Sequence, residues 1–232
     1  MGGATRTLLA GLAALGLSGC NMVVSERPWF NAASGPQLKD GIWTMVDTED
    51  CVVDPAAALP DWPDCARPVL ARGGEYLGPA SDDDELPPAQ RLDPARWDRI
   101  AHVLVDGRPQ IDQIASKGPV LASGPPVDGV DEGKSFYIYT AVQPVALDDA
   151  GRITALRRWP VLCGPKPARK ANKPGRSRFV TNKPFKGLAI KGEGCTAKDV
   201  AALRRAAAGS EAIAGGDGFA IITSRWVRDY AP

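Results

Sequence analysis

Histidine is scarce in this sequence, and paired metal-ligand motifs are missing from it. The chain of 232 residues has one histidine, His102, and no C-x-x-C pair. Zinc sites are usually built from several Cys and His ligands at short, fixed spacings. We therefore predict no metal site, and no other cofactor is indicated.

Motifs of common hydrolases and nucleotide-binding enzymes are also missing. The sequence has no G-x-S-x-G, and Gly192-Glu193-Gly194 lacks the third glycine and the Lys-Ser/Thr pair of phosphate-binding loops. In an alternating strand His102 shares a face with Ile100 and Leu104, which predicts a core or half-buried side chain. We expect no catalytic residue and no enzyme; an enzyme of unknown type remains an alternative.

Strong net charge and long apolar runs are absent as well. The formal net charge is +1, so the chain as a whole does not attract nucleic acid, and we predict no nucleic-acid partner. The uncharged run Leu8–Leu17 is too short to span a bilayer as a helix. No repeat of 20 to 50 residues is visible, which argues against solenoids and propellers.

The N-terminus has the order of a secretory signal. A short region ending in Arg6 precedes the apolar run, and Leu17-Ser18-Gly19-Cys20 follows it. These four residues resemble the lipobox of bacterial lipoproteins. The resemblance implies that residues 1–19 are a signal peptide and that Cys20 carries the lipid that anchors the mature protein to a membrane.

The residue after the cysteine bears on location. In Gram-negative lipoproteins an Asp at this position is the usual inner-membrane retention signal, and here it is Asn21. The resemblance therefore implies an outer-membrane lipoprotein of the cell envelope that faces the periplasm. Residues 20–39 contain Pro28 and Pro36 and no apolar period, which predicts a lipidated N-terminus and tether before a single β-rich domain over 40–232.

The remaining cysteines predict disulfides. Cys51, Cys65, Cys163 and Cys195 form an even set, as expected for an exported protein in an oxidising compartment. Four cysteines allow three pairings, of which the most local joins Cys51 to Cys65 and Cys163 to Cys195. We predict this pairing.

Short β-prone segments separated by turn signals fill most of residues 40–232. The tight turns are expected at Asp106-Gly107 and at 148–151. The expected strands are residues 41–46, 68–77, 97–105, 108–114, 135–142 with an extension past Pro144, 153–162 and 218–223, with possible strand starts at 179–181 and 188–190. Pro109 favours an edge position or a short arm for its strand.

One helix is predicted near residues 196–208. Thr196 and Asp199 have the spacing of a capping box, and Val200, Leu203 and Ala207 share one helix face. The predicted fold class is mainly β (α+β): a curved antiparallel meander, either a partly closed barrel or a sandwich, with one C-terminal helix.

The start of the first expected strand has a further likeness. Gly41-Ile42-Trp43, followed by a meander, a late helix and a final strand, resembles the lipocalin layout, whose first strand carries Gly-x-Trp. Long proline-rich insertions depart from the compact lipocalins. The resemblance implies a carrier of a small apolar ligand in a barrel lumen, which is an alternative functional hypothesis.

A run of positive charge is the most distinctive local feature of the sequence. Nine of the 28 Lys and Arg residues lie between Gly164 and Gly192, with no acidic residue among them. They are Lys166, Arg169, Lys170, Lys173, Arg176, Arg178, Lys183, Lys186 and Lys191. Such a run is either a solvated loop or an anion-binding face. In an envelope protein the anion would be lipopolysaccharide, phospholipid or peptidoglycan.

These observations lead to one preferred hypothesis. The sequence favours a lipid-anchored envelope lipoprotein that acts as a non-catalytic binding or assembly module. Its membrane partner would be reached through the N-terminal lipid, and its second partner would be one of the anionic envelope components.

Overall fold

The structure is a computed structural model that describes residues 21–46, 51–79, 86–117, 135–165, 180–192, 194–214 and 221–230. Its strands are β1 (Val24–Ser25), β2 (Gly41–Val46), β3 (Ala66–Arg72), β4 (Glu75–Gly78), β5 (Asp98–Val105), β6 (Gln110–Lys117), β7 (Ser135–Leu147), β8 (Ile153–Pro160), β9 (Leu188–Lys191), β10 (Gly194–Ala197) and β11 (Ile222–Arg228). The helices are α2 (Pro88–Arg91) and α3 (Val200–Ser210), with 3-10 turns η1 (Leu59–Asp61) and η3 (Pro94–Arg96).

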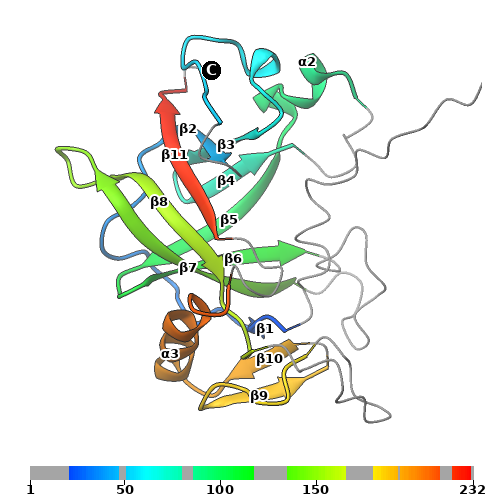
Figure 1. The fold of residues 1–232 in the computed structure, drawn as a ribbon, viewed down its shortest axis with the longest axis vertical. Coiled ribbons are helices and arrows are strands. Elements are labelled where there is room, and N and C mark those ends of the chain that lie inside the picture. Colours follow the sequence, from blue (N-terminus) through cyan, green and yellow to red (C-terminus); the bar gives the residue numbers. More distant parts are fainter. Residues whose placement is uncertain are drawn as a thin grey trace, which may run out of the picture.

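Eight strands form a closed antiparallel barrel (Figure 1). Strands β2 to β8 follow one another as a meander, β11 pairs with both β8 and β2, and β7 pairs with β8, so the sheet closes on itself. The fold is therefore mainly β with one C-terminal helix, as predicted, and the barrel is the correct one of the two architectures considered. Closure also leaves β6 in the middle of the sheet, so the edge position expected from Pro109 is wrong; Pro109 lies in the turn before that strand.

The two ends of the barrel differ in their connections. Short turns at residues 73–74, 106–109 and 148–152 join strands at one end, which we call the turn end. At the other end, the connection end, the joining segments are 47–65, 79–97, 118–134 and 161–221. The predicted hairpins at Asp106-Gly107 and 148–151 are confirmed, and Gly151 adopts the positive φ of 73° that this turn requires.

Helix α3 begins later than the sequence analysis predicts. Asp199, rather than Thr196, is the N-cap, and its side chain accepts a hydrogen bond of 2.6 Å from Ala202 N. Thr196 is in β10, where it pairs with Ala189 of β9. Thr196, which the capping-box pattern predicted as the start of the helix, is therefore part of a strand.

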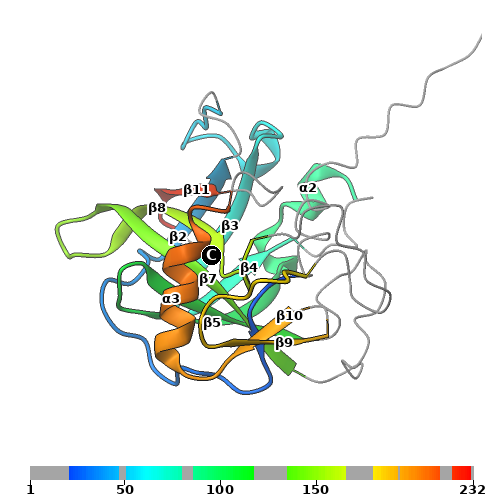
Figure 2. The ribbon, with the colours of Figure 1, turned by 60° about the horizontal axis from the view of Figure 1, so that its bottom comes forward.

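Helix α3 packs on the outside of the barrel (Figure 2). Its buried residues Leu203, Ala206 and Ala207 join a core cluster with Trp159 of β8 and Ile111 of β6. The indole of Trp159 donates a hydrogen bond of 2.9 Å to the carbonyl oxygen of Ala207. In the part of the chain that the structure describes, no helix is long and apolar enough to cross a membrane.

Both predicted disulfides are present. Cys51–Cys65 closes the connection between β2 and β3, and Cys163–Cys195 joins the segment after β8 to β10. The pairing predicted from sequence proximity is confirmed.

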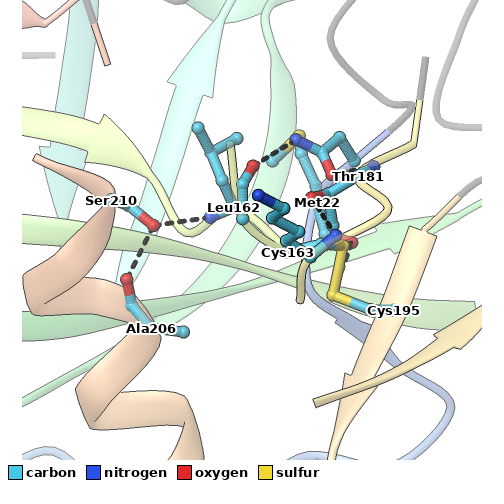
Figure 3. The surroundings of a disulfide bond; sticks show 10 residues. Met22, Leu162, Cys163, Thr181, Cys195, Ala206 and Ser210 are labelled. Atoms are coloured by element: carbon cyan, nitrogen blue, oxygen red, sulfur yellow. Dashed lines mark hydrogen bonds between the residues drawn. A yellow bond between two sulfur atoms is a disulfide. The ribbon is translucent and has the colours of Figure 1, made fainter. Parts of the chain in front are cut away.

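The segment predicted as a tether differs from that expectation. Asn21 and Val23 have no exposed surface, and β1 pairs with β7. The Asn21 side chain donates to Gly164 O (2.7 Å) and accepts from Thr181 N (3.0 Å). The next residue, Met22, lies with Thr181 beside the Cys163–Cys195 disulfide (Figure 3). The described part of residues 20–39 therefore packs on the barrel, because its backbone and Asn21 find partners that composition alone does not reveal.

Candidate functional site

The lumen at the turn end is filled with apolar side chains. Strand alternation sends every second residue inward, and Trp43, Leu104, Val142, Ile153 and Leu156 pack together there, each at most 3% exposed. The N-terminal segment covers this end, where the carbonyl oxygen of residue 37 accepts from Ile153 N at 2.8 Å. No ligand is needed to explain this half of the lumen.

The half of the lumen nearer the connection end contains a pocket of about 260 Å³. Its walls are mostly apolar, and residues from all eight barrel strands contribute. The lining residues are Leu38, Trp43, Met45, Val69, Tyr76, Leu77, Gly78, Ile100, Ile114, Ile138, Arg158 and Ser224. We call this feature the lumen pocket.

A hydrogen-bonded polar cluster lies against the lumen pocket. Asp112, with no exposed surface, accepts from His102 Nδ1 at 2.8 Å through Oδ1 and from the Tyr76 hydroxyl at 2.7 Å through Oδ2. The rings of Tyr76 and His102 stack with centroids 3.9 Å apart. Strand pairing builds this arrangement, because β4, β5 and β6 are neighbours and each residue points inward.

Arg158 brings a positive charge to the same cluster from β8. Its Nη2 donates to the Tyr76 hydroxyl at 3.3 Å, and its guanidinium carbon lies 5.2 Å from the centre of the Tyr76 ring. The side chain keeps some exposure because it lines the pocket, yet its Nε atom is buried and has no hydrogen-bond partner. We call Tyr76, His102, Asp112 and Arg158 the lumen cluster.

The electrostatics of the lumen cluster fix its charge state near neutral pH. Burial alone would raise the pKa of Asp112, but the hydrogen bond and charge of His102, together with Arg158, hold this pKa below its ordinary value. Burial raises the pKa of the Tyr76 phenol. The pKa of Arg158 is raised, although burial would lower it, because Tyr76 and Asp112 stabilise its charge. Asp112 is thus an anion beside a cationic Arg158 and a neutral Tyr76.

The ionised Asp112 sets the orientation of the imidazole. A carboxylate only accepts hydrogen bonds, so Nδ1 of His102 carries a proton and donates it. Within the described residues, Asp112 is the only hydrogen-bond partner of the His102 imidazole. Because no hydroxyl or thiol of these residues is bonded to the imidazole, the arrangement lacks the nucleophile–base contact of a hydrolase.

Three buried polar atoms near the lumen cluster have no partner. They are Arg158 Nε, Thr140 Oγ1 and Ser224 Oγ. Thr140 lies opposite Asp112 on β7, and Ser224 lines the lumen pocket from β11. Buried donors and acceptors are nearly always satisfied in folded proteins, so these atoms are positions where an ordered water or a bound molecule would complete the hydrogen bonding.

The basic residues singled out in the sequence fall partly outside the described residues. Lys166, Arg169, Lys170, Lys173, Arg176 and Arg178 lie there, as does Cys20. Lys183 and Lys186 are described and exposed, and Lys191 pairs with Glu26 at 2.5 Å. The lumen cluster contains none of these lysines.

Two cations missed by the sequence analysis lie beside Lys186. Arg205 of α3 donates to the Lys186 carbonyl oxygen at 3.5 Å. A side-chain carbon at Gly187 would contact both Lys198 and Arg205, which places these cations around residue 187. Lys198 also faces Asp199 at 3.8 Å. Four exposed cations, Lys183, Lys186, Lys198 and Arg205, thus lie on this part of the surface, and we call them the basic face.

Most of the lumen cluster was also missed. Strand alternation around His102 predicted its inward face, but Tyr76, Asp112 and Arg158 come from three other strands. Only the register, with Tyr76 opposite Ile100 and Leu104 opposite Asp112, brings them together. The available signal was the polar residue at an inward position of each apolar strand.

Comparisons with known proteins add nothing to this geometry. No protein-family model, curated protein or solved structure matches the chain.

Proposed function

We propose that the protein is a non-catalytic binding protein of the bacterial cell envelope that carries a small, mostly apolar molecule in its barrel lumen. The observation that carries this proposal is the lumen pocket, an apolar cavity that ends on buried polar atoms without partners. Concave, mostly apolar sites with a few oriented polar groups are typical ligand sites.

The dimensions and lining of the pocket favour a compact ligand. Its volume of about 260 Å³ is near the lower limit of small-molecule sites. Ile100, Ile114 and Ile138 supply apolar contact, while Arg158 and Ser224 supply polar groups. This lining supports a ligand that has an apolar body and one polar group.

Plugging the pocket tests the proposal. Gly78 lines the pocket, and a side-chain carbon placed there meets no atom within 4 Å. Gly78→Trp should therefore fold and fill the cavity. We expect the parent to bind the neutral fluorescent probe N-phenyl-1-naphthylamine with a blue-shifted emission, and the Gly78→Trp variant to bind it at least about tenfold more weakly.

Val145→Trp is the matched control, because Val145 is 60% exposed on the hairpin between β7 and β8. This variant should bind the probe as the parent does. If the parent shows no saturable probe binding, or Gly78→Trp binds as well as the parent, the lumen is not the binding site and the proposal is wrong.

We also propose that Cys20 carries the lipid anchor and that the protein is held at the outer membrane. The two disulfides support an oxidising compartment outside the cytoplasm. Because Asn21 is buried, an anchor at Cys20 would hold the barrel close to the membrane surface without a long tether. Radiolabelled palmitate should enter the parent but not Cys20→Ala; absence of label from the parent would contradict the anchor.

The basic face is proposed to contact an anionic envelope component: lipopolysaccharide, phospholipid or peptidoglycan. The exposed Lys183 and Lys186, with Lys198 and Arg205 nearby, support this proposal. Protein without its lipid should bind anionic vesicles in low salt and lose this binding as the Debye length falls from about 10 Å to 3 Å. Neutralising Lys170, Lys173, Arg176 and Arg178 should remove most of it, and unchanged binding would assign these residues to a solvated loop.

A further inference from the structure

We infer that the molecule carried in the lumen pocket is a monocarboxylic acid whose carboxylate binds the guanidinium group of Arg158. This inference rests on the proposed carrier function and names the chemical class of its ligand. The geometry that points to it is an under-used cation facing an apolar cavity.

The donors of Arg158 are mostly unoccupied by protein. A guanidinium group has five N–H donors in a planar fork. In the described residues, the Arg158 side chain makes one hydrogen bond, from Nη2 to the Tyr76 hydroxyl at 3.3 Å, while its buried Nε has no partner. The fork is therefore free to receive an acceptor from the pocket that Arg158 lines.

Asp112 does not take the role of this acceptor. Its Oδ1 is bonded to His102 and its Oδ2 to Tyr76. Among the described residues no direct ion pair joins Asp112 to Arg158, and Tyr76 stands between them. The aspartate balances the charge of the cluster at a distance and leaves the fork without a bidentate partner.

A carboxylate fits the free fork in shape and in charge. Planar carboxylates bind guanidinium groups through two parallel N–H···O bonds. The single negative charge of a carboxylate is also easier to place near the Asp112 anion than the nearly two negative charges of a phosphate monoester. Ser224 also lines the pocket, and its unpartnered hydroxyl can donate a further hydrogen bond to the same group.

The apolar lining defines the rest of the ligand. Met45, Val69, Ile100, Ile114 and Ile138 supply most of the apolar lining of the pocket. With its carboxylate on Arg158, a ligand would therefore place an aliphatic or aromatic body between these side chains. A compact fatty acid or arylalkanoic acid has this form.

Octanoate and octanamide separate the charge from the shape of such a ligand. The two compounds have nearly the same size, but only octanoate carries a carboxylate. Each would be titrated into the protein loaded with N-phenyl-1-naphthylamine, and displacement of the probe would be recorded. We expect octanoate to bind the parent at least about tenfold more tightly than octanamide, because a charge-assisted pair replaces a neutral hydrogen bond.

The variant that removes the cation is designed to keep the lumen neutral and filled. Arg158→Met alone would leave Asp112 without its balancing charge, so it is combined with Asp112→Asn. The affinity of this double variant for the neutral probe is measured first, and the variant should then lose the preference for octanoate over octanamide, with an affinity ratio near 1. Arg157→Met, on the outer face of the same strand beside Glu211, is the matched control and should keep the preference.

A conservative variant distinguishes ligand binding by Arg158 from a purely structural role of this residue. Arg158→Lys keeps the charge without the fork, so octanoate should bind more weakly than in the parent and still more tightly than octanamide. Equal affinities of the parent for octanoate and octanamide, or a preference that persists in the double variant, would overturn the inference. If the neutral probe is still displaced by octanamide, the carrier function stands; if no probe binds the parent at all, both fail.

Discussion

The two halves of the barrel lumen use the same strands in different ways. At the turn end, inward positions hold Trp43, Leu104, Ile153 and Leu156, and the N-terminal segment covers them. Further toward the connection end, the same alternation places Tyr76, Gly78, Arg158 and Ser224 inward, where they line a pocket of about 260 Å³. One half of the lumen is thus a hydrophobic core, and the other half has the properties of a binding site.

This difference teaches where the stability and the function of the fold reside. Filled positions gain free energy from packing, since a buried aliphatic side chain contributes about 2–5 kcal/mol relative to alanine. Each unpartnered buried hydroxyl costs about 1–3 kcal/mol until a ligand or water satisfies it. Local sacrifice of stability is common at functional sites, and Arg158 and Ser224, which line the lumen pocket, both carry a buried polar atom without a partner.

Removing Asp112 should have the largest effect on the free energy of unfolding. It disrupts the half of the lumen that contains the lumen pocket, which we call the open half. Asp112→Ala leaves Arg158 without its counter-charge and leaves His102 and Tyr76 without their acceptor. We expect a loss of about 4 kcal/mol in the free energy of unfolding, the range found when one partner of a buried charged pair is deleted. Urea denaturation followed by tryptophan fluorescence measures this loss.

The companion variant for this prediction is Asp112→Asn with Arg158→Met. Because it removes both charges, it should be less destabilised than the Asp112→Ala single variant. A double variant as unstable as the sum of the single variants would show that the two residues act independently.

Truncating Ile153 should have the next largest effect, this time in the filled half. Ile153 has no exposed surface and lies near the turn between β7 and β8. Ile153→Ala should cost about 3 kcal/mol of unfolding free energy through lost burial and a cavity. Binding of N-phenyl-1-naphthylamine by the folded variant should stay at the parent level, because Ile153 does not line the lumen pocket; weakened binding would show that the two halves are coupled.

Acid should lower the contribution of Asp112 to the free energy of unfolding. We expect this effect to be smaller than that of Ile153→Ala. The pKa of Asp112 is lowered in the folded state, so its contribution to stability is fully present above the pKa of the unfolded chain, near 4 by reference values. The contribution is lost as pH falls through the lower folded pKa. The stability difference between the parent and Asp112→Asn, measured by urea denaturation from pH 6 to pH 2, should therefore shrink on acidification; a constant difference would mean that Asp112 is not ionised in the fold.

Much of the fold was predictable because its signals are local. The Asp106-Gly107 turn, the strand alternation around His102 and the spacing of Cys51 and Cys65 each depend on a few neighbouring residues. Closure of the sheet was not predictable in this way, since it depends on β11 pairing with β2 across almost the whole chain. The packing of Asn21 against residues 164 and 181 is equally non-local.

The candidate site was hidden for the same reason. His102 was recognised as an inward-facing residue, but its partners Asp112 and Tyr76 could be assigned only with the register between β4, β5 and β6. Arg158 stood in the sequence beside Arg157, and nothing local told the inward arginine from the outward one. Polar residues on the inner face of a closed barrel become a site only after closure is known.

Removing the hydroxyl of Ser224 should have the smallest effect, and its sign should be opposite to that of Ile153→Ala. Ser224 is 2% exposed, lines the lumen pocket and has an Oγ atom without a partner. Ser224→Ala deletes that buried hydroxyl while leaving the backbone pairing of β11 with β2 and β8 intact. We expect a gain of about 1 kcal/mol in the free energy of unfolding without ligand, because the cost of an unsatisfied polar group disappears. The same variant should bind octanoate more weakly, since it loses one donor to the carboxylate.

Ser210→Ala is the matched control: this hydroxyl donates to Ala206 O at 2.6 Å and accepts from Leu162 N at 2.9 Å, so its removal should destabilise the fold. Equal destabilisation by both serine variants would mean that Ser224 already has a partner in solution, and the lumen would then lose its distinction between a filled half and a half that awaits a ligand.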